Sequence, residues 1–255
     1  MSDFDRNYAR AIPADRADMS VDAGLRSFML GVYNKLALGL LLSAGLAWVT
    51  GSFAPVQALL FKIADLPSGS SVIVGYTPLG WVVSLAPLGI LLASGFLMRS
   101  ISPRTASLIY WSVVALIGAS MGSLMLLYTG TSIASTFLIT ASAFGVLSLV
   151  GYTTKKDLSG IGSFLIMGVW GLLIASIVNI FLGSSLMQML IAGVGVLIFA
   201  GLTAYDTQRL KLSYYEMGGD GAAMSVATSM GALNLYLDFI NLFRFMLMFL
   251  GVRRD

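Results

Sequence analysis

Apolar stretches of about twenty residues recur along the chain and limit its fold more than any other feature. Each has roughly the ~20 residues that a helix needs to cross the hydrocarbon core of a bilayer. Of the 255 residues, 57% are hydrophobic and 11% are charged, which is outside the usual range for a soluble domain. The chain is therefore predicted to be an all-α integral membrane protein that lies in a lipid bilayer. The first six stretches lie near residues 29–50, 79–98, 106–128, 132–151, 161–182 and 186–205.

A seventh apolar segment, near residues 231–251, differs from the others because its polar residues are ordered. Asn234, Asp238 and Asn241 are spaced i, i+4, i+7, which places them on one narrow helical face with Arg244 at its flank. A charge at the centre of a lipid-exposed helix costs about 2.5 to 3.5 kcal/mol. We therefore expect seven transmembrane helices, six of them surrounding a central seventh that turns this face inward.

The remaining segments predict one domain with a tail. Residues 1–26 are polar and of mixed charge, so they read as a disordered cytoplasmic tail, and residues 27–255 as a single seven-helix transmembrane domain. Residues 51–78 contain several prolines and serines and are expected to form an irregular loop. Lys35, near the start of the first span, is expected to snorkel to the cytoplasmic surface.

The placement of lysine and arginine predicts a cytoplasmic amino terminus. Seven complete crossings would leave Arg253 and Arg254 outside, whereas a re-entrant last segment would keep them inside. We expect seven crossings because residues 231–251 are long enough to span. The basic residues on the predicted cytoplasmic side are Arg6, Arg10, Arg16, Arg26, Arg99, Arg104, Lys155, Lys156, Arg209 and Lys211.

The absence of cysteine and histidine narrows the possible chemistry. Thiolate metal sites and cysteine nucleophiles are excluded, and any response to pH near neutrality must come from carboxylates. The net charge of +3 is small and the basic residues form no stripe with aromatic residues, so no nucleic-acid partner is expected. No cofactor is indicated.

Asp206, in AYDTQRLK at residues 204–211, is the second unusual acid. Thr203 precedes it and Arg209 follows it by one turn, so an ordinary interfacial ion pair is one interpretation. If the last helix returns from the cytoplasmic side, however, Asp238 would lie one to two turns inside it and approach Asp206. Two carboxylates in one dry site cannot both ionise cheaply and would share a proton.

A buried arginine is the natural counter-charge for such a pair. Arg244 lies near the polar face of the last helix, and Arg99 ends the second span, where positive-inside anchoring is the alternative explanation. Thr203, Asn234 and Asn241 are candidate supporting polar residues.

These residues also carry a family resemblance. AYDTQRLK followed by ALNLYLDFINLF resembles the signature of the Bax inhibitor-1 (transmembrane Bax inhibitor motif) family, and RSFMLGVYNKLALGL at residues 26–40 resembles the start of its bacterial members. The resemblance implies seven helices with a central last helix, a pH-sensing aspartate dyad at Asp206 and Asp238, and a pH-sensitive calcium leak. It also implies a latching arginine at Arg99 and a bacterial cytoplasmic (inner) membrane.

Calcium takes six to eight oxygen ligands, and only two acids converge here. Asp206 and Asp238 are thus expected to bind calcium weakly, as a transported ion, along a path gated by protons. Two other classes remain open: a proton-coupled secondary transporter, and a non-catalytic regulator of a membrane protease or other membrane partner. An intramembrane aspartyl protease would require a GxGD motif, which the chain lacks, so no enzymatic activity is expected.

Overall fold

The structure is a computed structural model that describes residues 23–65, 71–97 and 101–254. Seven of its helical segments are long and apolar enough to cross a membrane, which confirms the predicted all-α class and its seven spans. The spans are α1, α3, α4 continued by α5, α6, α7, α8 and α9. The elements are α1 (Ala23–Ser52), α2 (Ala54–Leu60), β1 (Phe61–Asp65), β2 (Ser71–Tyr76), α3 (Pro78–Leu97), α4 (Pro103–Ser120), α5 (Gly122–Leu127), α6 (Gly130–Thr153), α7 (Ser159–Leu182), α8 (Ser185–Glu216) and α9 (Gly221–Leu250).

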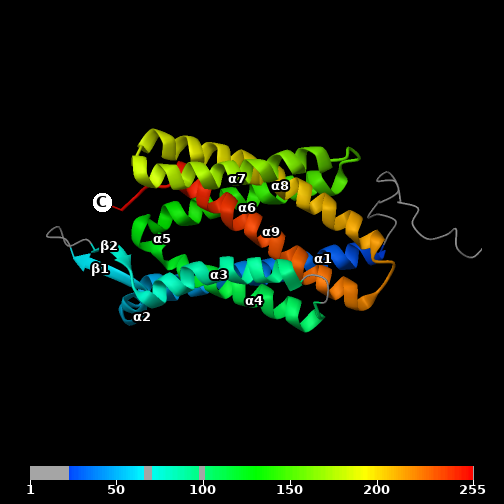
Figure 1. The fold of residues 1–255 in the computed structure, drawn as a ribbon, viewed down its shortest axis with the longest axis horizontal. Coiled ribbons are helices and arrows are strands. Elements are labelled where there is room, and N and C mark those ends of the chain that lie inside the picture. Colours follow the sequence, from blue (N-terminus) through cyan, green and yellow to red (C-terminus); the bar gives the residue numbers. More distant parts are fainter. Residues whose placement is uncertain (1–22, 66–70, 98–100, 255) are drawn as a thin grey trace, which may run out of the picture.

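Helix α9 runs diagonally between two groups of helices, α6, α7 and α8 on one side and α1, α3 and α4 on the other (Figure 1). It packs against α1, α4, α6 and α8, while α3 packs on α4 and α7 packs on α8. Half of the α9 span is buried, against 6% of the α7 span. The last helix is therefore the most buried span, but the expectation that six helices surround it is not confirmed: four do.

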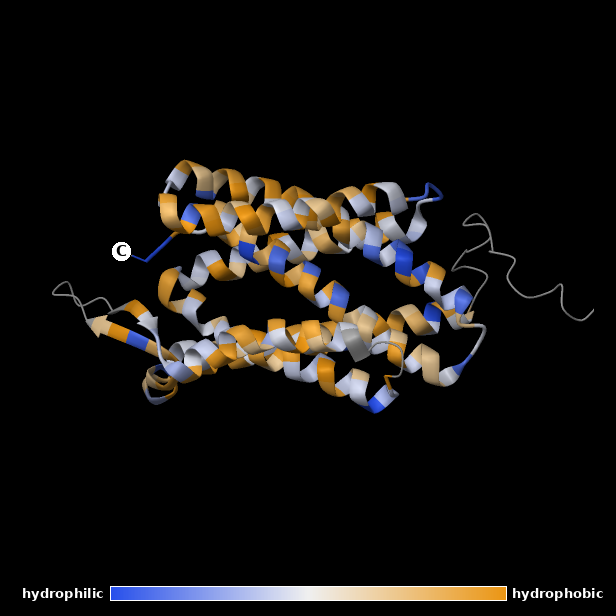
Figure 2. Ribbon diagram, viewed as in Figure 1, coloured by the Kyte–Doolittle hydropathy of each residue, from blue (hydrophilic) through white to orange (hydrophobic). Residues whose placement is uncertain are grey.

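Aromatic side chains fill the interface around α9. Tyr236 and Phe239 are almost fully buried, and Phe239 makes edge contacts with the rings of Phe137 and Phe144 on α6. Hydrophobic residues also cover the outside of the bundle, whereas hydrophilic residues recur along α9 (Figure 2). This distribution is typical of a chain whose outer surface faces lipid and whose polar groups face inward.

The last helix begins ten residues before the predicted start, at Gly221. Gly218 and Gly219 adopt positive φ angles of 57° and 87° in the preceding turn, and the Asp220 carboxylate caps the helix by accepting hydrogen bonds from two backbone N–H groups. With 30 residues, α9 is about 45 Å long. It ends at the same end of the bundle as α2 and the hairpin, opposite the start of α1 (Figure 1), so α9 runs the length of the bundle and is long enough to cross a membrane.

Residues 51–78 are not the irregular loop that their prolines predicted. Pro55 lies in the first turn of α2, where a missing N–H costs nothing, and β1 pairs with β2 in an antiparallel hairpin with a bulge between Lys62 and Ile63. The ring of Phe61 in β1 makes an edge contact with the ring of Tyr76 in β2, which joins the two strands. The alternation that marks these short strands was too brief to identify against the proline and glycine signals.

Two predictions near the amino terminus also change. Residues 1–22 lie outside the described part of the chain, but residues 23–26 belong to α1, so the domain begins before residue 27. Lys35 does not snorkel outward: its Nζ donates to Ser107 Oγ at 3.1 Å and to Ser229 Oγ at 2.7 Å. Hydroxyls from α4 and α9 offer the ammonium group partners inside the bundle, which the sequence of α1 alone does not reveal.

Candidate functional site: an aspartate pair between α8 and α9

The carboxyl groups of Asp206 on α8 and Asp238 on α9 lie within hydrogen-bonding reach of each other. Asp206 is partly exposed, whereas Asp238 is only 5% exposed. Among the described residues, Oδ2 of Asp238 finds no donor N–H or O–H. A buried carboxylate oxygen without a donor is costly, so the pair favours a proton held between its two members.

Both acids lie well inside their helices. Asp206 is ten residues, or about 15 Å, before Glu216 at the end of α8. Asp238 is 17 residues, or about 26 Å, after Gly221 at the start of α9. The expectation that Asp238 lies one to two turns inside the last helix is therefore wrong, because that helix begins earlier. The acids still meet because α8 also extends beyond its apolar part.

A close helix crossing fixes the level of the pair. A Cβ atom added to Gly151 of α6 would lie 2.1 Å from the carbonyl oxygen of Ala204 on α8, so only glycine permits this approach. Gly151 is two residues before the end of α6, and Ala204 is two residues before Asp206. Asp206 thus lies near the end of α6, toward the end of the bundle where α1 begins (Figure 1).

Among the described residues, the cation that acts on the pair is Arg209, whose charge attracts the Asp206 carboxylate. Its guanidinium is exposed, one turn after Asp206. Arg244 is also exposed and lies six residues, about 9 Å, beyond Asp238 toward the far end of α9. Arg99 is outside the described residues. The ion-pair interpretation of Asp206 and the dyad interpretation are therefore compatible.

The other predicted polar residues do not converge on the acids as a group. Thr203 is fully buried, and its hydroxyl donates to the carbonyl of Phe199 in its own helix at 2.8 Å. Asn234 is exposed and Asn241 is partly buried, so only Asp238 of the predicted polar face is enclosed. The face is divided because α9 crosses the bundle obliquely and different turns meet different neighbours.

Gln208, which sequence reasoning missed, ties α8 to the loop between α6 and α7. Its Oε1 accepts from the N–H of Leu158 at 2.8 Å, and its Nε2 donates to the carbonyl of Lys156 at 2.8 Å. One turn later, the buried Lys211 donates from Nζ to the carbonyl of Tyr152 at 2.9 Å. The only sequence signal was a run of polar residues in the second half of AYDTQRLK.

Replacing Gln208 with leucine is expected to lower the free energy of unfolding by about 1–3 kcal/mol, because a loop N–H and a loop carbonyl lose their partners. Hydrogen exchange at the Leu158 amide should accelerate. Gln208→Glu retains the acceptor and should keep that amide protected, which makes it the matched control. Equal exchange in the leucine variant and the unaltered protein would show that the loop is held by other contacts.

Metal binding at the pair is limited by its donor set. Within the part of the chain that the structure describes, no group of three or more His, Cys, Asp or Glu side chains lies together. Two carboxyl groups alone supply at most four oxygens, fewer than the six to eight that calcium takes. Any calcium at Asp206 and Asp238 would keep most of its water.

Fold and site together define a seven-span membrane protein with a paired carboxyl site between its last two helices. A family model described as "Inhibitor of apoptosis-promoting Bax1" matches residues 25–255. The chain belongs to the Bax inhibitor-1 family, as its two motifs predicted.

Similar proteins occur in several bacteria. A protein of Caulobacter vibrioides is 61% identical over 255 residues, which is 100% of both chains. The protein RP147 of Rickettsia prowazekii is 41% identical over 249 residues, covering 98% of this chain and 99% of its own. The inner membrane protein YbhL of Escherichia coli is 38% identical over 233 residues, covering 91% and 94%.

Proposed function

We propose that this protein is a calcium leak channel of the bacterial inner membrane, gated by protonation of the Asp206–Asp238 pair. The observation that carries the proposal is the meeting of two carboxyl groups, one of them buried, between α8 and α9. Ionisable residues inside membrane spans are rare and mark ion and proton pathways. Its activity is transport, with no enzymatic step.

The gate depends on how many protons the pair holds. With one shared proton, a hydrogen bond between the two acids holds α8 and α9 together, and Arg209 on α8 offsets the single negative charge of the pair. A second proton removes this charge and weakens the hydrogen bond between the acids, because a neutral bond is weaker than a charge-assisted one, so the two helices separate more easily. Protons favour the open state only as far as they bind it more tightly than the closed state.

Calcium is the cargo in this scheme and needs no tight site. Conduction requires an ion to leave as readily as it enters, and two carboxylates with water provide weak coordination of that kind. The pair lies toward the end of the bundle where α1 begins (Figure 1), which is the cytoplasmic end if lysine and arginine set the topology. The gate then closes the path on the cytoplasmic side.

The test is calcium entry into dye-loaded proteoliposomes between about pH 5 and 8. We expect entry above that of empty liposomes, rising as the pH falls. Entry that depends on a proton gradient instead of on pH itself would favour a proton-coupled transporter. Absence of calcium entry at every pH would exclude the channel hypothesis. The remaining hypothesis would be a regulator that binds a membrane protease or another membrane partner.

A further inference from the structure

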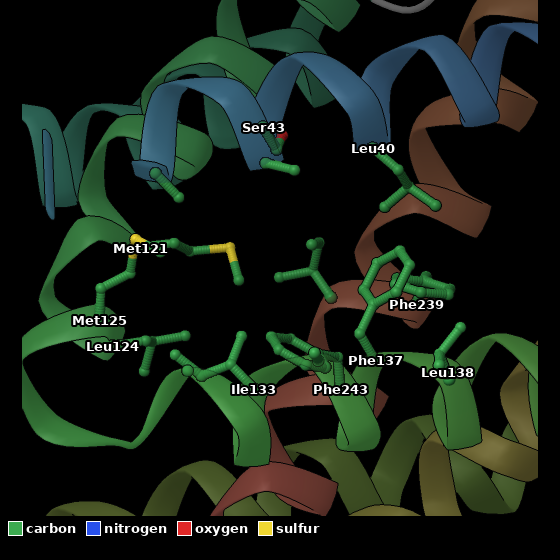
Figure 3. Close-up of a pocket in the computed structure, with 15 residues that line it drawn as sticks. Leu40, Ser43, Met121, Leu124, Met125, Ile133, Phe137, Leu138, Phe239 and Phe243 are labelled. Carbon is green, nitrogen blue, oxygen red and sulfur yellow. The ribbon is translucent and has the colours of Figure 1, made fainter. Parts of the chain in front are cut away.

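Two cavities lie end to end between α1 and α6, and residues of α9 line part of both. Their volumes are about 480 Å³ and about 440 Å³, and both are bounded by Leu40 and Phe239. We name the first the Met125 cavity and the second the Arg26 cavity. Figure 3 shows the Met125 cavity between α1 and α6, with Phe239 and Phe243 of α9 on its wall. The Arg26 cavity continues from there toward the start of α1.

The lining of the Arg26 cavity changes from charged to polar to apolar along its length. Arg26 lies at the start of α1, and Ser148 lies five residues before the end of α6. Further in, the walls are Leu36, Ala37 and Phe144. From Arg26 to Leu40 the cavity follows 14 residues of α1, about 21 Å, which exceeds half of the ~30 Å hydrocarbon core. One end of the cavity therefore lies at the start of α1, and the other lies deep in the bundle at Leu40 and Phe239.

Ser148 is a buried polar group that lacks a partner. It is 5% exposed, and within the described chain its Oγ forms no hydrogen bond. Serines inside helices usually satisfy their hydroxyl on a carbonyl of the preceding turn, as Thr140 does on the carbonyl of Thr136 in the same helix. An unpaired hydroxyl on a cavity wall points to a ligand that carries oxygen atoms at that depth.

We infer that the Arg26 cavity binds one membrane phospholipid with an anionic headgroup. The phosphate lies at Arg26, the glycerol ester oxygens accept from Ser148, and one acyl chain follows α1 and α6 to Phe239. Arginine suits a phosphate, and a basic group at the membrane surface favours anionic lipids. The described lining of the cavity contains no acidic residue that would oppose this charge.

The cavity is too small for a helix from a partner protein. A helix of the same ~21 Å length and about 10 Å width occupies roughly 1,600 Å³, more than the free space of about 1060 Å³ in and in front of the cavity. A single chain of methylene groups has the right proportions. This assignment does not depend on calcium conduction, because it rests on the cavity, Arg26 and Ser148 alone.

The test is a titration of the purified protein in detergent, followed by native mass spectrometry. Phosphatidylglycerol serves as the anionic probe and phosphatidylcholine as the zwitterionic one. We expect one saturable phosphatidylglycerol site and at least about tenfold weaker binding of phosphatidylcholine, which corresponds to about 1.4 kcal/mol. Arg26→Gln should abolish this preference, and Ser148→Ala should weaken both lipids.

A matched pair on α6 tests the location. A Cβ atom at Gly145 meets nothing within 4 Å, and Gly145 lines the cavity, so Gly145→Phe should fill the space and reduce phosphatidylglycerol binding about tenfold. Val146, the next residue, is 63% exposed on the outer face, and Val146→Phe should bind as the unaltered chain does. Equal binding by both variants, retention of a fatty acid instead of phospholipid, or no saturable site would each overturn the inference.

Discussion

A chain that carries both Asp206→Asn and Asp238→Asn is expected to pass calcium at a rate that does not vary with pH. Asparagine keeps the size of aspartate but cannot take up a proton, so the pair loses both its charge and its titration. A single-proton gate changes its occupancy by at most about tenfold per pH unit, because one unit is worth about 1.4 kcal/mol. In the double variant we expect less than about twofold variation between about pH 5 and 8.

The control is an acid outside the membrane at the same end of the bundle. Asp157 lies in the loop between α6 and α7, and a hydrogen bond from Ser159 lowers the pKa of its carboxyl group. It stays ionised over the range measured, so Asp157→Asn should keep the pH dependence of the unaltered protein. Either single substitution in the pair should alter the curve. If Asp238→Asn alone conducts with an unaltered pH dependence, the dyad gate is wrong.

Replacing Gly151 with alanine is expected to cause a large loss of stability for so small a change. The new methyl group would lie 2.1 Å from the carbonyl oxygen of Ala204, and both atoms belong to helix backbones that cannot move independently. We expect the free energy of unfolding to fall by about 1–3 kcal/mol or more. Unfolding in mixed detergent, followed by circular dichroism, measures this change.

Gly145→Ala, on the same helix, is the matched control, because its Cβ atom has open space around it. The two alanine variants share helix and chemistry and differ only in what the methyl group meets. We expect Gly145→Ala to unfold at the same detergent fraction as the unaltered protein or at a higher one. If both variants unfold alike, the close approach of α6 to α8 is not what sets the stability of this crossing.

The seven spans could be predicted from residue order, and the boundaries of the last two could not. Hydropathy marks only the part of a helix that lies in the hydrocarbon, so the polar extensions of α8 to Glu216 and of α9 back to Gly221 were missed. The hairpin in residues 51–78 was missed for a related reason. Its strands are stabilised by each other, and a short strand carries little signal of its own.

The partners of individual polar residues also depended on contacts between distant helices. Lys35 bonds Ser229 across 194 residues of sequence, and Gln208 bonds Lys156 across 52. Spacing along one helix predicts a shared face, but it does not say which neighbour covers each turn. For that reason the face of Asn234, Asp238 and Asn241 was predicted as a unit, although only Asp238 is enclosed.

By itself, the sequence determined that this protein lies in a membrane, that it crosses seven times, and that Asp206 and Asp238 are the acids to pair. These properties follow from local hydrophobicity and from the cost of leaving a charge in lipid, both of which act residue by residue. Only the tertiary structure decided that four helices pack around α9 and that a cavity lies between α1 and α6. Those features arise from packing between helices. Such packing depends on the shapes of side chains and the distances between helices, which spacing along the sequence does not reveal.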